Sequence, residues 1–192
     1  MNFTENIILE NNSVLLRPLT AEDEKGLSKI AFDADIWKYT VTRAMNSTEL
    51  KEYINIALED RERNSRYPFS IIDKASGEIA GSTSYGNIYV KDKRIEIGWT
   101  WLAKKFIGSG LNKECKFLLL QYAFEHLMFE RVEFKTDFLN KAARKALVKI
   151  GAKEEGILKS HTLMHDGRRR DTIYYSILAD EWKEIKNMNF YR

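Results

Sequence analysis

The sequence predicts one α/β domain built on a mixed sheet flanked by helices, and three observations lead to this prediction. Strand-like and helix-like segments alternate along most of the 192-residue chain. Three strand-like segments between residues 67 and 101 follow one another through short turns, which indicates an antiparallel meander. The last of them is followed by a long amphipathic segment and a further strand, a connection that requires a parallel pairing.

Composition agrees with a single compact chain. Hydrophobic residues make up 44% of it, yet no run of 18 apolar residues occurs, so we expect no membrane span. The first six residues lack the features of a signal peptide, and one cysteine excludes a disulfide framework, so the expected location is the cytoplasm. A net charge of +3 is too small to indicate nucleic-acid binding. Neither nucleic acid nor membrane is therefore an expected partner, and residues 1–192 are read as one domain.

The first elements are a short strand and two helices. Val14–Leu19 is strand-like. Thr20 with Asp23 three residues later is typical of a capped helix start, and the predicted helix runs to about Ala34. A second helix is predicted to begin at Asn46–Thr48, where apolar residues recur at helical spacing.

Strands of the meander follow. Tyr67–Ile72 and Ile79–Tyr85 are strand-like, and Asp73–Gly77 joins them as a hairpin turn in which the glycine takes a positive φ. The next strand, Arg94–Trp101, alternates strictly. That pattern predicts that four side chains share one face: Ile95, Ile97, Trp99 and Trp101.

The second half continues the alternation. A helix is predicted from Leu111 to about Met128, with Cys115 on its apolar stripe and therefore in the core. Arg131–Thr136 is a strand, and a short helix capped by Asn140 follows. Residues 154–163 and 170–178 are two last strands, after which a helical turn begins near residue 180.

Two glycines stand where a phosphate can bind. Gly108 and Gly110 directly precede the long helix, where bare backbone N–H groups and the helix dipole favour an anion. A plain tight turn is the alternative interpretation. Lysine near a helix start opposes the helix dipole and is tolerated more readily where an anion binds. An anion site is therefore favoured by Lys105, Lys113 and Lys116. The spacing matches neither a Walker loop nor a dinucleotide fingerprint.

These segments resemble a known family. Glu96–Leu102, then Lys105–Gly110 and the long helix, resemble motif A of the GCN5-related N-acetyltransferase (GNAT) family. Residues 140–156, 165–171 and 174–182, with the opening Leu15–Leu19, are similar to the branch that acetylates ribosomal-protein N-termini. The resemblance covers nearly the whole chain in order. It implies a three-layer fold with a central, mixed, mostly antiparallel sheet.

The resemblance also implies the chemistry. The family transfers acetyl from acetyl-CoA to an amine by direct attack, without a covalent enzyme intermediate. The implied acceptor is a protein N-terminal α-amine. A small amine (polyamine, amino sugar or drug) and a catalytically silent CoA-binding module are the alternatives. No metal is expected, because the three histidines lack ligand spacing. The sequence leaves the oligomeric state open, a homodimer included.

Site residues are carried over from the family's pattern. The pantetheine arm is expected to pair with the strand that ends at Trp101. The backbone N–H groups of Gly108 to Gly110, with neighbours up to Asn112, are expected to hold the pyrophosphate. Asn140 matches an asparagine that contacts the pantetheine arm. The complete implied cofactor set is Trp99, Thr100, Trp101, Lys105, Phe106, Ile107, Gly108, Ser109, Gly110, Leu111, Asn112, Asn140 and Arg144.

Proton transfer requires a base and an acid. Glu96 matches a position that is acidic in several branches and is the implied catalytic base, acting through water. A strand glutamate with a structural partner is the alternative, and Glu155 and Asp171 are lesser candidates.

Two further positions of the family's pattern concern catalysis. Asn140 is the second catalytic candidate, against the alternative of a plain helix cap. Ala143 stands where this branch often has a serine that protonates the thiolate. Tyr174 or Tyr175 could replace that serine, or the thiolate leaves directly to solvent.

Overall fold

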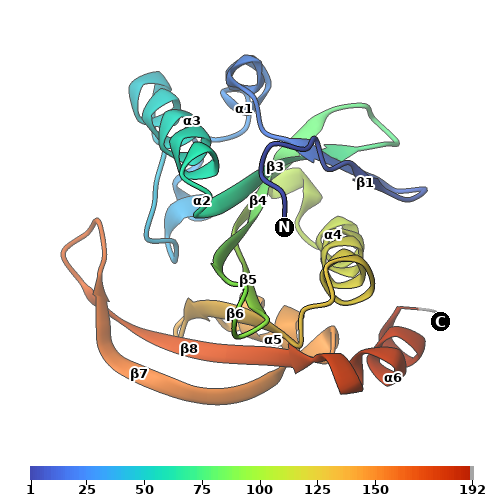
Figure 1. Cartoon of the computed structure of the whole chain (residues 1–192). Helices are drawn as coiled ribbons and strands as arrows, with labels where there is room; N and C mark the ends of the chain where they lie inside the picture. The colour runs from blue at the N-terminus through green and yellow to red at the C-terminus, as the bar shows by residue number, and fades with distance from the viewer. Residues whose placement is uncertain (191–192) are drawn as a thin grey trace.

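The computed structural model describes residues 1–190, which form one eight-stranded sheet with helices on both faces (Figure 1). The strand order is β1-β2-β3-β4-β5-β6-β8-β7, and every pair is antiparallel except β5 with β6. The strands are β1 (Leu9–Glu10), β2 (Val14–Pro18), β3 (Arg66–Asp73), β4 (Ile79–Tyr89), β5 (Arg94–Leu102), β6 (Arg131–Asp137), β7 (Lys153–Leu163) and β8 (Arg169–Leu178). The expected mixed, mostly antiparallel sheet is confirmed.

Six α-helices flank the sheet within the described range. They are α1 (Glu24–Leu27), α2 (Ala34–Trp37), α3 (Ser47–Glu62), α4 (Leu111–Gln121), α5 (Lys141–Lys149) and α6 (Ala179–Asn189). Short 3-10 turns occupy Ala21–Asp23 and Lys104–Phe106, and a π turn, Tyr122–His126, extends α4. The predicted helix that begins at Leu111 is thus confirmed, with its last turn wound more loosely.

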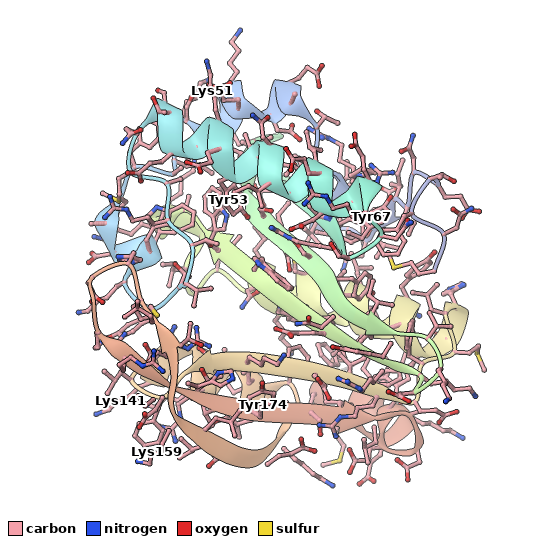
Figure 2. All side chains as sticks on the ribbon, turned by 60° about the vertical axis from the view of Figure 1, so that its left-hand side comes forward. Lys51, Tyr53, Tyr67, Lys141, Lys159 and Tyr174 are labelled. Atoms are coloured by element: carbon pink, nitrogen blue, oxygen red, sulfur yellow. The ribbon has the colours of Figure 1, made fainter. Side chains whose placement is uncertain are left out.

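The two faces of the sheet differ in what covers them. On one face, here called the α4 face, α4, α5 and α6 bury a large apolar core that includes Ile95, Cys115 and Trp182. On the other, the α3 face, α1 to α3 bury a smaller cluster around Trp37 and Tyr53. Figure 2 looks onto the α3 face, where α3 lies over the upper strands and no helix of the described chain lies in front of β6 and β8. One half of the α3 face therefore stays open.

The parallel pair β5–β6 is short. It is hydrogen-bonded over Arg94↔Arg131, Ile95↔Val132 and Glu96↔Glu133. Beyond Glu96, β5 continues to Leu102 and β6 to Asp137 with no pairing between them. The sheet therefore splits into two halves, β1–β5 and β6–β8–β7, which diverge from this point (Figure 1). We call the opening between the ends of β5 and β6 the splay.

A bulge in β5 overturns the predicted alternation. In the register with β4, Ser84 lies opposite Gly98 but Ser82 lies opposite Trp101, so one residue too many stands between them on β5. Trp99 takes up the extra length with φ +49°. An inserted residue reverses the faces beyond it. Trp101 consequently packs in the α3-face cluster, and the predicted common face with Ile95 and Ile97 is wrong.

The first predicted helix is also corrected. It ends at Leu27 instead of about Ala34, and α2 is a separate helix capped by Asp33, whose side chain accepts from the N–H of Asp35. The Ala31 carbonyl, which a continuing helix needs for its own ladder, accepts instead from Trp37 Nε1 at 2.7 Å. A tertiary contact therefore overrides the local helical pattern.

Other predicted boundaries agree closely with the structure. Asp23 Oδ2 accepts from the Thr20 N–H at 3.0 Å, and Asn46 caps α3. The chain end differs, because α6 forms an 11-residue helix rather than one turn, with Trp182 in the core. The two-residue β1 was not predicted.

Candidate active site

The glycine loop before α4 presents bare backbone to solvent. Gly108 and Gly110 have φ +84° and +91°, and a Cβ added at either would meet no atom within 4 Å. The N–H groups of Gly108, Gly110 and Asn112 find no acceptor among the described residues, whereas Leu111 N–H bonds to Ser109 Oγ. Three free donors at a helix start form a cradle for an anion. The loop therefore fits an anion such as a phosphate group.

Side chains of the loop mainly hold its shape. Phe106 and Leu111 are buried in the α4-face core, and Ser109 Oγ donates to the Phe106 carbonyl at 2.8 Å. Ile107 is 67% exposed. Lys105 forms an ion pair with Glu78 at the surface. The predicted contacts of these residues with a cofactor remain predictions, and the free backbone is what the structure offers for them.

Asn112 adds an unsatisfied group to the first turn of α4. Its Oδ1 atom is buried and has no hydrogen-bond partner within residues 1–190. Buried polar atoms are almost always satisfied, so this atom is suited to bind a polar group of a ligand. An amide turned about its last bond presents Nδ2 at the same place. Asn112 can therefore match either an acceptor or a donor on the cofactor.

Lys116 is buried close to the bulge of β5. Only 6% of it is exposed, and its ammonium lies 2.7 Å from Thr100 Oγ1 and 3.5 Å from Thr83 Oγ1. No carboxylate in the described part of the chain pairs with it. Burial lowers the pKa of Lys116 from 10.5 to about 8. The sequence predicted that this lysine, near the helix start, favours an anion; in the structure its side chain is buried and donates to Thr100.

Trp99 and Trp101 have their side chains engaged on the α3 face. Trp101 is buried, and its Nε1 donates to Tyr53 Oη at 3.1 Å. The Trp99 ring covers Gly86, whose added Cβ would lie 2.4 Å from it, and the Arg66 guanidinium stacks 4.9 Å from the ring centroid. Only the backbone of this part of β5 is therefore free to bind a cofactor.

Asn140 and Arg144 both stabilise the start of α5. Asn140 Oδ1 accepts from the Ala143 N–H at 3.0 Å, so the residue is a helix cap, and its Nδ2 has no partner among the residues described. Arg144 donates to the Phe138 carbonyl at 3.2 Å and to Tyr175 Oη at 3.3 Å. Their contacts with CoA stay predictions.

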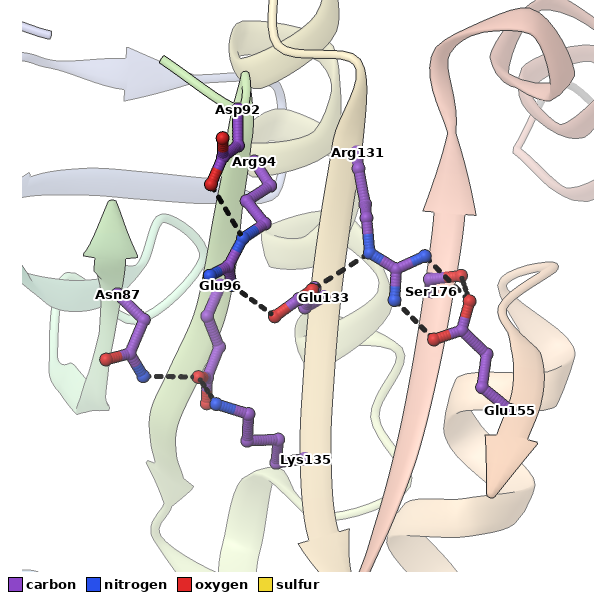
Figure 3. Close-up of polar contacts among 9 residues, drawn as sticks. All are labelled: Asn87, Asp92, Arg94, Glu96, Arg131, Glu133, Lys135, Glu155 and Ser176. Atoms are coloured by element: carbon purple, nitrogen blue, oxygen red, sulfur yellow. Dashed lines mark hydrogen bonds and ion pairs between the residues drawn. The ribbon is translucent and has the colours of Figure 1, made fainter. Parts of the chain in front are cut away.

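Glu96 lies at the point where the splay opens, on the α3 face. It is 6% exposed, and its Oε2 atom accepts from Asn87 at 2.6 Å and pairs with Lys135 at 2.7 Å (Figure 3). Its Oε1 atom has no hydrogen bond within the described chain and lies against Gly98, 2.9 Å from the Cβ that a side chain there would add. The structural partner that the alternative interpretation required is therefore present, yet one carboxylate oxygen remains available.

Lys135 supports the charge on this carboxylate. Burial lowers the pKa of Lys135, but the hydrogen bond and charge of Glu96 outweigh that effect, so its pKa is raised. Its ammonium also lies 5.1 Å from the Tyr174 ring centroid. Lys135 is thus a fixed cation between β6 and β8 on the open half of the α3 face.

A row of ion pairs crosses the closed end of the splay. Glu133 forms ion pairs with Arg131 at 2.9 Å and with Arg94 at 3.5 Å, and Arg131 forms a further ion pair with Glu155 (Figure 3). The hydrogen bond with Arg131 lowers the pKa of Glu155, and Ser176 donates to it as well. Glu155 therefore links β6, β7 and β8 where the strands still pair, away from the opening. Its catalytic role remains an untested prediction.

The two tyrosines proposed as acids face opposite ways. Tyr175 is 1% exposed in the α4-face core and donates to Glu154 at 3.1 Å, whereas Tyr174 lies on the α3 face (Figure 2). Asp171 accepts from the Ser160 N–H at 2.7 Å in the β7–β8 hairpin. Nothing in these contacts assigns the acid.

The β7–β8 hairpin closes the open half of the α3 face at one end. Its tip rises toward α2 (Figure 1), where His165 Nε2 donates to the Trp37 carbonyl at 3.1 Å. Arg168, also in the tip, pairs with the fully buried Asp137 at 2.5 Å. The sequence did not single out Asp137, because it falls at the end of a strand without a motif.

Comparisons with known proteins agree with this geometry. Residues 13–153 match the family model described as Acetyltransferase (GNAT) domain. The chain belongs to the GNAT family of acetyltransferases. The splayed parallel pair and the glycine loop are thus parts of an N-acetyltransferase fold, and the protein is an acetyltransferase enzyme.

Individual relatives add detail. The chain is 35% identical over 110 residues to "Putative ribosomal N-acetyltransferase YdaF" of Bacillus subtilis (strain 168), covering 57% of this chain and 59% of that protein. The crystal structure of a "putative acetyltransferase" from T. thermophilus superposes with TM-score 0.87 at 31% identity, covering 96% of this chain and 95% of that one. The ribosomal-protein-S5-alanine acetyltransferase of Vibrio fischeri shares the fold, with TM-score 0.75 at 19% identity over 92% and 99% of the two chains.

Residues 1–190 contain neither a metal-binding cluster nor a membrane-spanning helix. No group of three or more His, Cys, Asp or Glu side chains is arranged to hold a metal ion. No helix in this range is long and apolar enough to cross a membrane.

Lys116 gives a prediction about stability and pH. Its pKa is lower in the folded than in the unfolded chain, so between about pH 8 and 10.5 the unfolded chain holds the extra proton. The free energy of unfolding should therefore rise with pH through this window, and the penalty below it is about 3 kcal/mol. We expect Lys116→Met to stabilise the protein by about 2 kcal/mol at pH 7 and by much less near pH 10. Urea unfolding at both pH values measures this.

Lys113→Met is the matched control, because Lys113 is exposed on the same helix. It should leave the free energy of unfolding nearly unchanged at either pH. Equal destabilisation by Lys116→Met at pH 7 and pH 10 would contradict the buried, unneutralised lysine.

Proposed function

We propose that this enzyme transfers acetyl from acetyl-CoA to an amine at the splay between β5 and β6. The observation that carries the proposal is that pairing of β5 with β6 ends after Glu96, while the free N–H groups of the glycine loop follow the end of the same strand. An unpaired strand edge can accept an extended amide chain, and a helix start can accept a pyrophosphate. The two features together fit the pantetheine arm and the diphosphate of one ligand.

The α3 face suits the acceptor amine, because the segments proposed to bind acetyl-CoA lie toward the α4 face. The glycine loop leads into α4, which covers the opposite face. The open half of the α3 face carries Glu96 and Lys135 at the same splay. An amine approaching from this face reaches the thioester that acetyl-CoA supplies from the side opposite α4.

Glu96 is the proposed base. An amine attacks a thioester only when neutral, and the pKa of an α-amine, about 7.7–8.0, leaves a useful neutral fraction at pH 7. Oε2 is held by Asn87 and Lys135, so the carboxylate is fixed while Oε1 can accept a proton through a water molecule. The same residue is thus positioned by one oxygen and reactive through the other.

A protein N-terminal α-amine is the proposed acceptor. Support comes from the Bacillus relative with a ribosomal N-acetyltransferase name and from the open half of the α3 face, where no helix of the described chain lies in front of β6 and β8. Turnover of a small amine alone is the alternative outcome.

Thiol release tests the proposed reaction. With acetyl-CoA and a panel of N-terminal peptides, polyamines and amino sugars, we expect free CoA to appear with peptides carrying a free α-amine. N-terminally blocked copies of the same peptides are the controls and should release none. Release with polyamines or amino sugars but not peptides would move the assignment to a small-amine acetyltransferase.

Gly108→Val tests the donor site. A β-branched residue at φ +84° is strained and its side chain fills the open cradle, so we expect the affinity for CoA to fall at least about tenfold. Isothermal titration with CoA measures it. Gly167→Val is the matched control, because Gly167 has φ +81° and an equally open Cβ position in the β7–β8 turn. Equal affinities of the two variants would remove the loop from the site.

Glu96→Gln tests the base. Loss of the carboxylate should lower kcat/KM most at acidic pH, where neutral amine is scarce, by about 10²-fold or more. The pH–rate profile from pH 6 to 9 shows it. Glu59→Gln removes an exposed carboxylate of α3 that pairs with Arg63, and should leave the profile unchanged. A Glu96→Gln profile that keeps its shape would make the residue structural.

A further inference from the structure

Arg170 is a buried cation that no contact in the described chain explains. It lies on β8 opposite Thr162 of β7, two residues beyond Thr172, whose pairing with Asp137 is the last between β8 and β6. Alternation along β8 places it on the same side as Tyr174, hence on the α3 face, where β6 has ended and the splay is open.

Its guanidinium has no partner within the described range. Arg170 is 7% exposed, and its Nε atom is buried without a hydrogen bond. None of its side-chain nitrogen atoms makes a hydrogen bond or ion pair with any residue between 1 and 190. Arginine remains charged in proteins, so a mostly buried positive charge is held here with no direct ion-pair partner in the described chain.

The neighbouring carboxylates are already paired. Asp137 binds Arg168 at 2.5 Å, and Glu96 binds Lys135 at 2.7 Å. Burial lowers the pKa of Arg170, and the charges of Asp137 and Glu96 offset only part of that effect. Arg168, which also lies 4.0 Å from Asp166, and Lys135 therefore have ion-pair partners, whereas Arg170 has none among residues 1–190.

Such an arrangement is costly unless an anion completes it. An unpaired buried charge destabilises a fold by several kcal/mol, so it persists mainly where a ligand uses it. The phosphates of CoA are not the matching anion, because their proposed cradle, Gly108–Asn112, opens α4 on the other face. The anion must enter from the side on which the acceptor amine approaches Glu96.

We propose that Arg170 binds a carboxylate carried by the acceptor, so that the enzyme acetylates amines with an acidic group close to the reacting nitrogen. The inference rests on the proposed function. A guanidinium offers two parallel N–H donors that match a carboxylate. Arg170 would hold the acid while Glu96, at the same splay, takes the proton from the amine. The carboxylate has two sources, the α-carboxylate of a free amino acid or an acidic side chain beside a peptide N-terminus.

Paired acceptors test this preference and separate the sources. One arm compares L-alanine with L-alaninamide, and the other compares peptides that begin Ala-Asp with the same peptides beginning Ala-Asn. Both arms use wild type, Arg170→Met and the control Arg169→Met, since Arg169 is exposed and bonds to Ser160. A carboxylate also changes the pKa of the nearby amine, so the quantity compared is the ratio of wild type to variant for each acceptor.

We expect Arg170→Met to raise KM about 30-fold or more for the acidic member of at least one pair. KM for the uncharged member and for acetyl-CoA should change less than about twofold. Arg170→Lys keeps the charge but loses the planar fork, and should fall between wild type and Arg170→Met. The arm that responds identifies the source of the carboxylate.

Product binding gives a second readout that does not need turnover. Titration with N-acetyl-L-alanine and N-acetyl-L-alaninamide, and with the acetylated Asp and Asn peptides, should show tighter binding of an acidic product in wild type only. The melting temperature of Arg170→Met should not fall, because the variant removes an unpaired charge. If no amine releases CoA, the proposed function fails, while this titration still decides the role of Arg170.

Three results would overturn the inference. Equal binding of acidic and uncharged products by wild type would show that no carboxylate is recognised. An equal rise of KM for all acceptors, or a rise for acetyl-CoA, would place Arg170 at the donor or in the scaffold. A large fall in melting temperature with unchanged acceptor preference would make it a structural residue.

Discussion

The constraint on which the rest of the structure depends is the early end of the β5–β6 ladder. Only three residue pairs join these strands, and the ion pair of Arg94 with Glu133 links them at that end. A parallel pair that stops inside a sheet leaves main-chain donors and acceptors without partners, which is costly unless something fills the opening. The bulge at Trp99 adds to the divergence, because it bends and twists the strand where pairing is lost.

At the splay, the two faces of the sheet offer different binding groups. On the α4 side the chain offers backbone, namely the glycine loop and the free edge of β5, while the side chains of Phe106 and Leu111 serve the core. On the α3 side it offers charge, with Glu96 fixed by Lys135 and Arg170 left without a partner among residues 1–190. Backbone suits a ligand that is the same in every cycle, whereas charged side chains can select among acceptors.

Two cations illustrate how stability is given up near the site. Lys116 belongs to α4, and its buried ammonium has only threonine hydroxyls as hydrogen-bond partners. Arg170 belongs to β8, and its side chain has no hydrogen-bond partner in the described chain. Apolar residues of similar size would stabilise both positions. Natural proteins keep such local conflicts mainly where function requires them, and here both lie beside the same opening in the sheet.

Sequence alone determined the order of the elements, the meander, the parallel crossover and the glycine loop, because each depends on local signals such as periodicity, caps and turn residues. It also carried the resemblance that the family match on residues 13–153 later confirmed. Tertiary structure decided what local signals cannot encode. The bulge at Trp99 moved Trp101 to the other face, and the contact of Trp37 with the Ala31 carbonyl ended a helix early. The partners of Glu96 and the isolation of Arg170 depend on strands brought together from distant parts of the chain, so only the folded sheet reveals which charges are balanced and which one is left over.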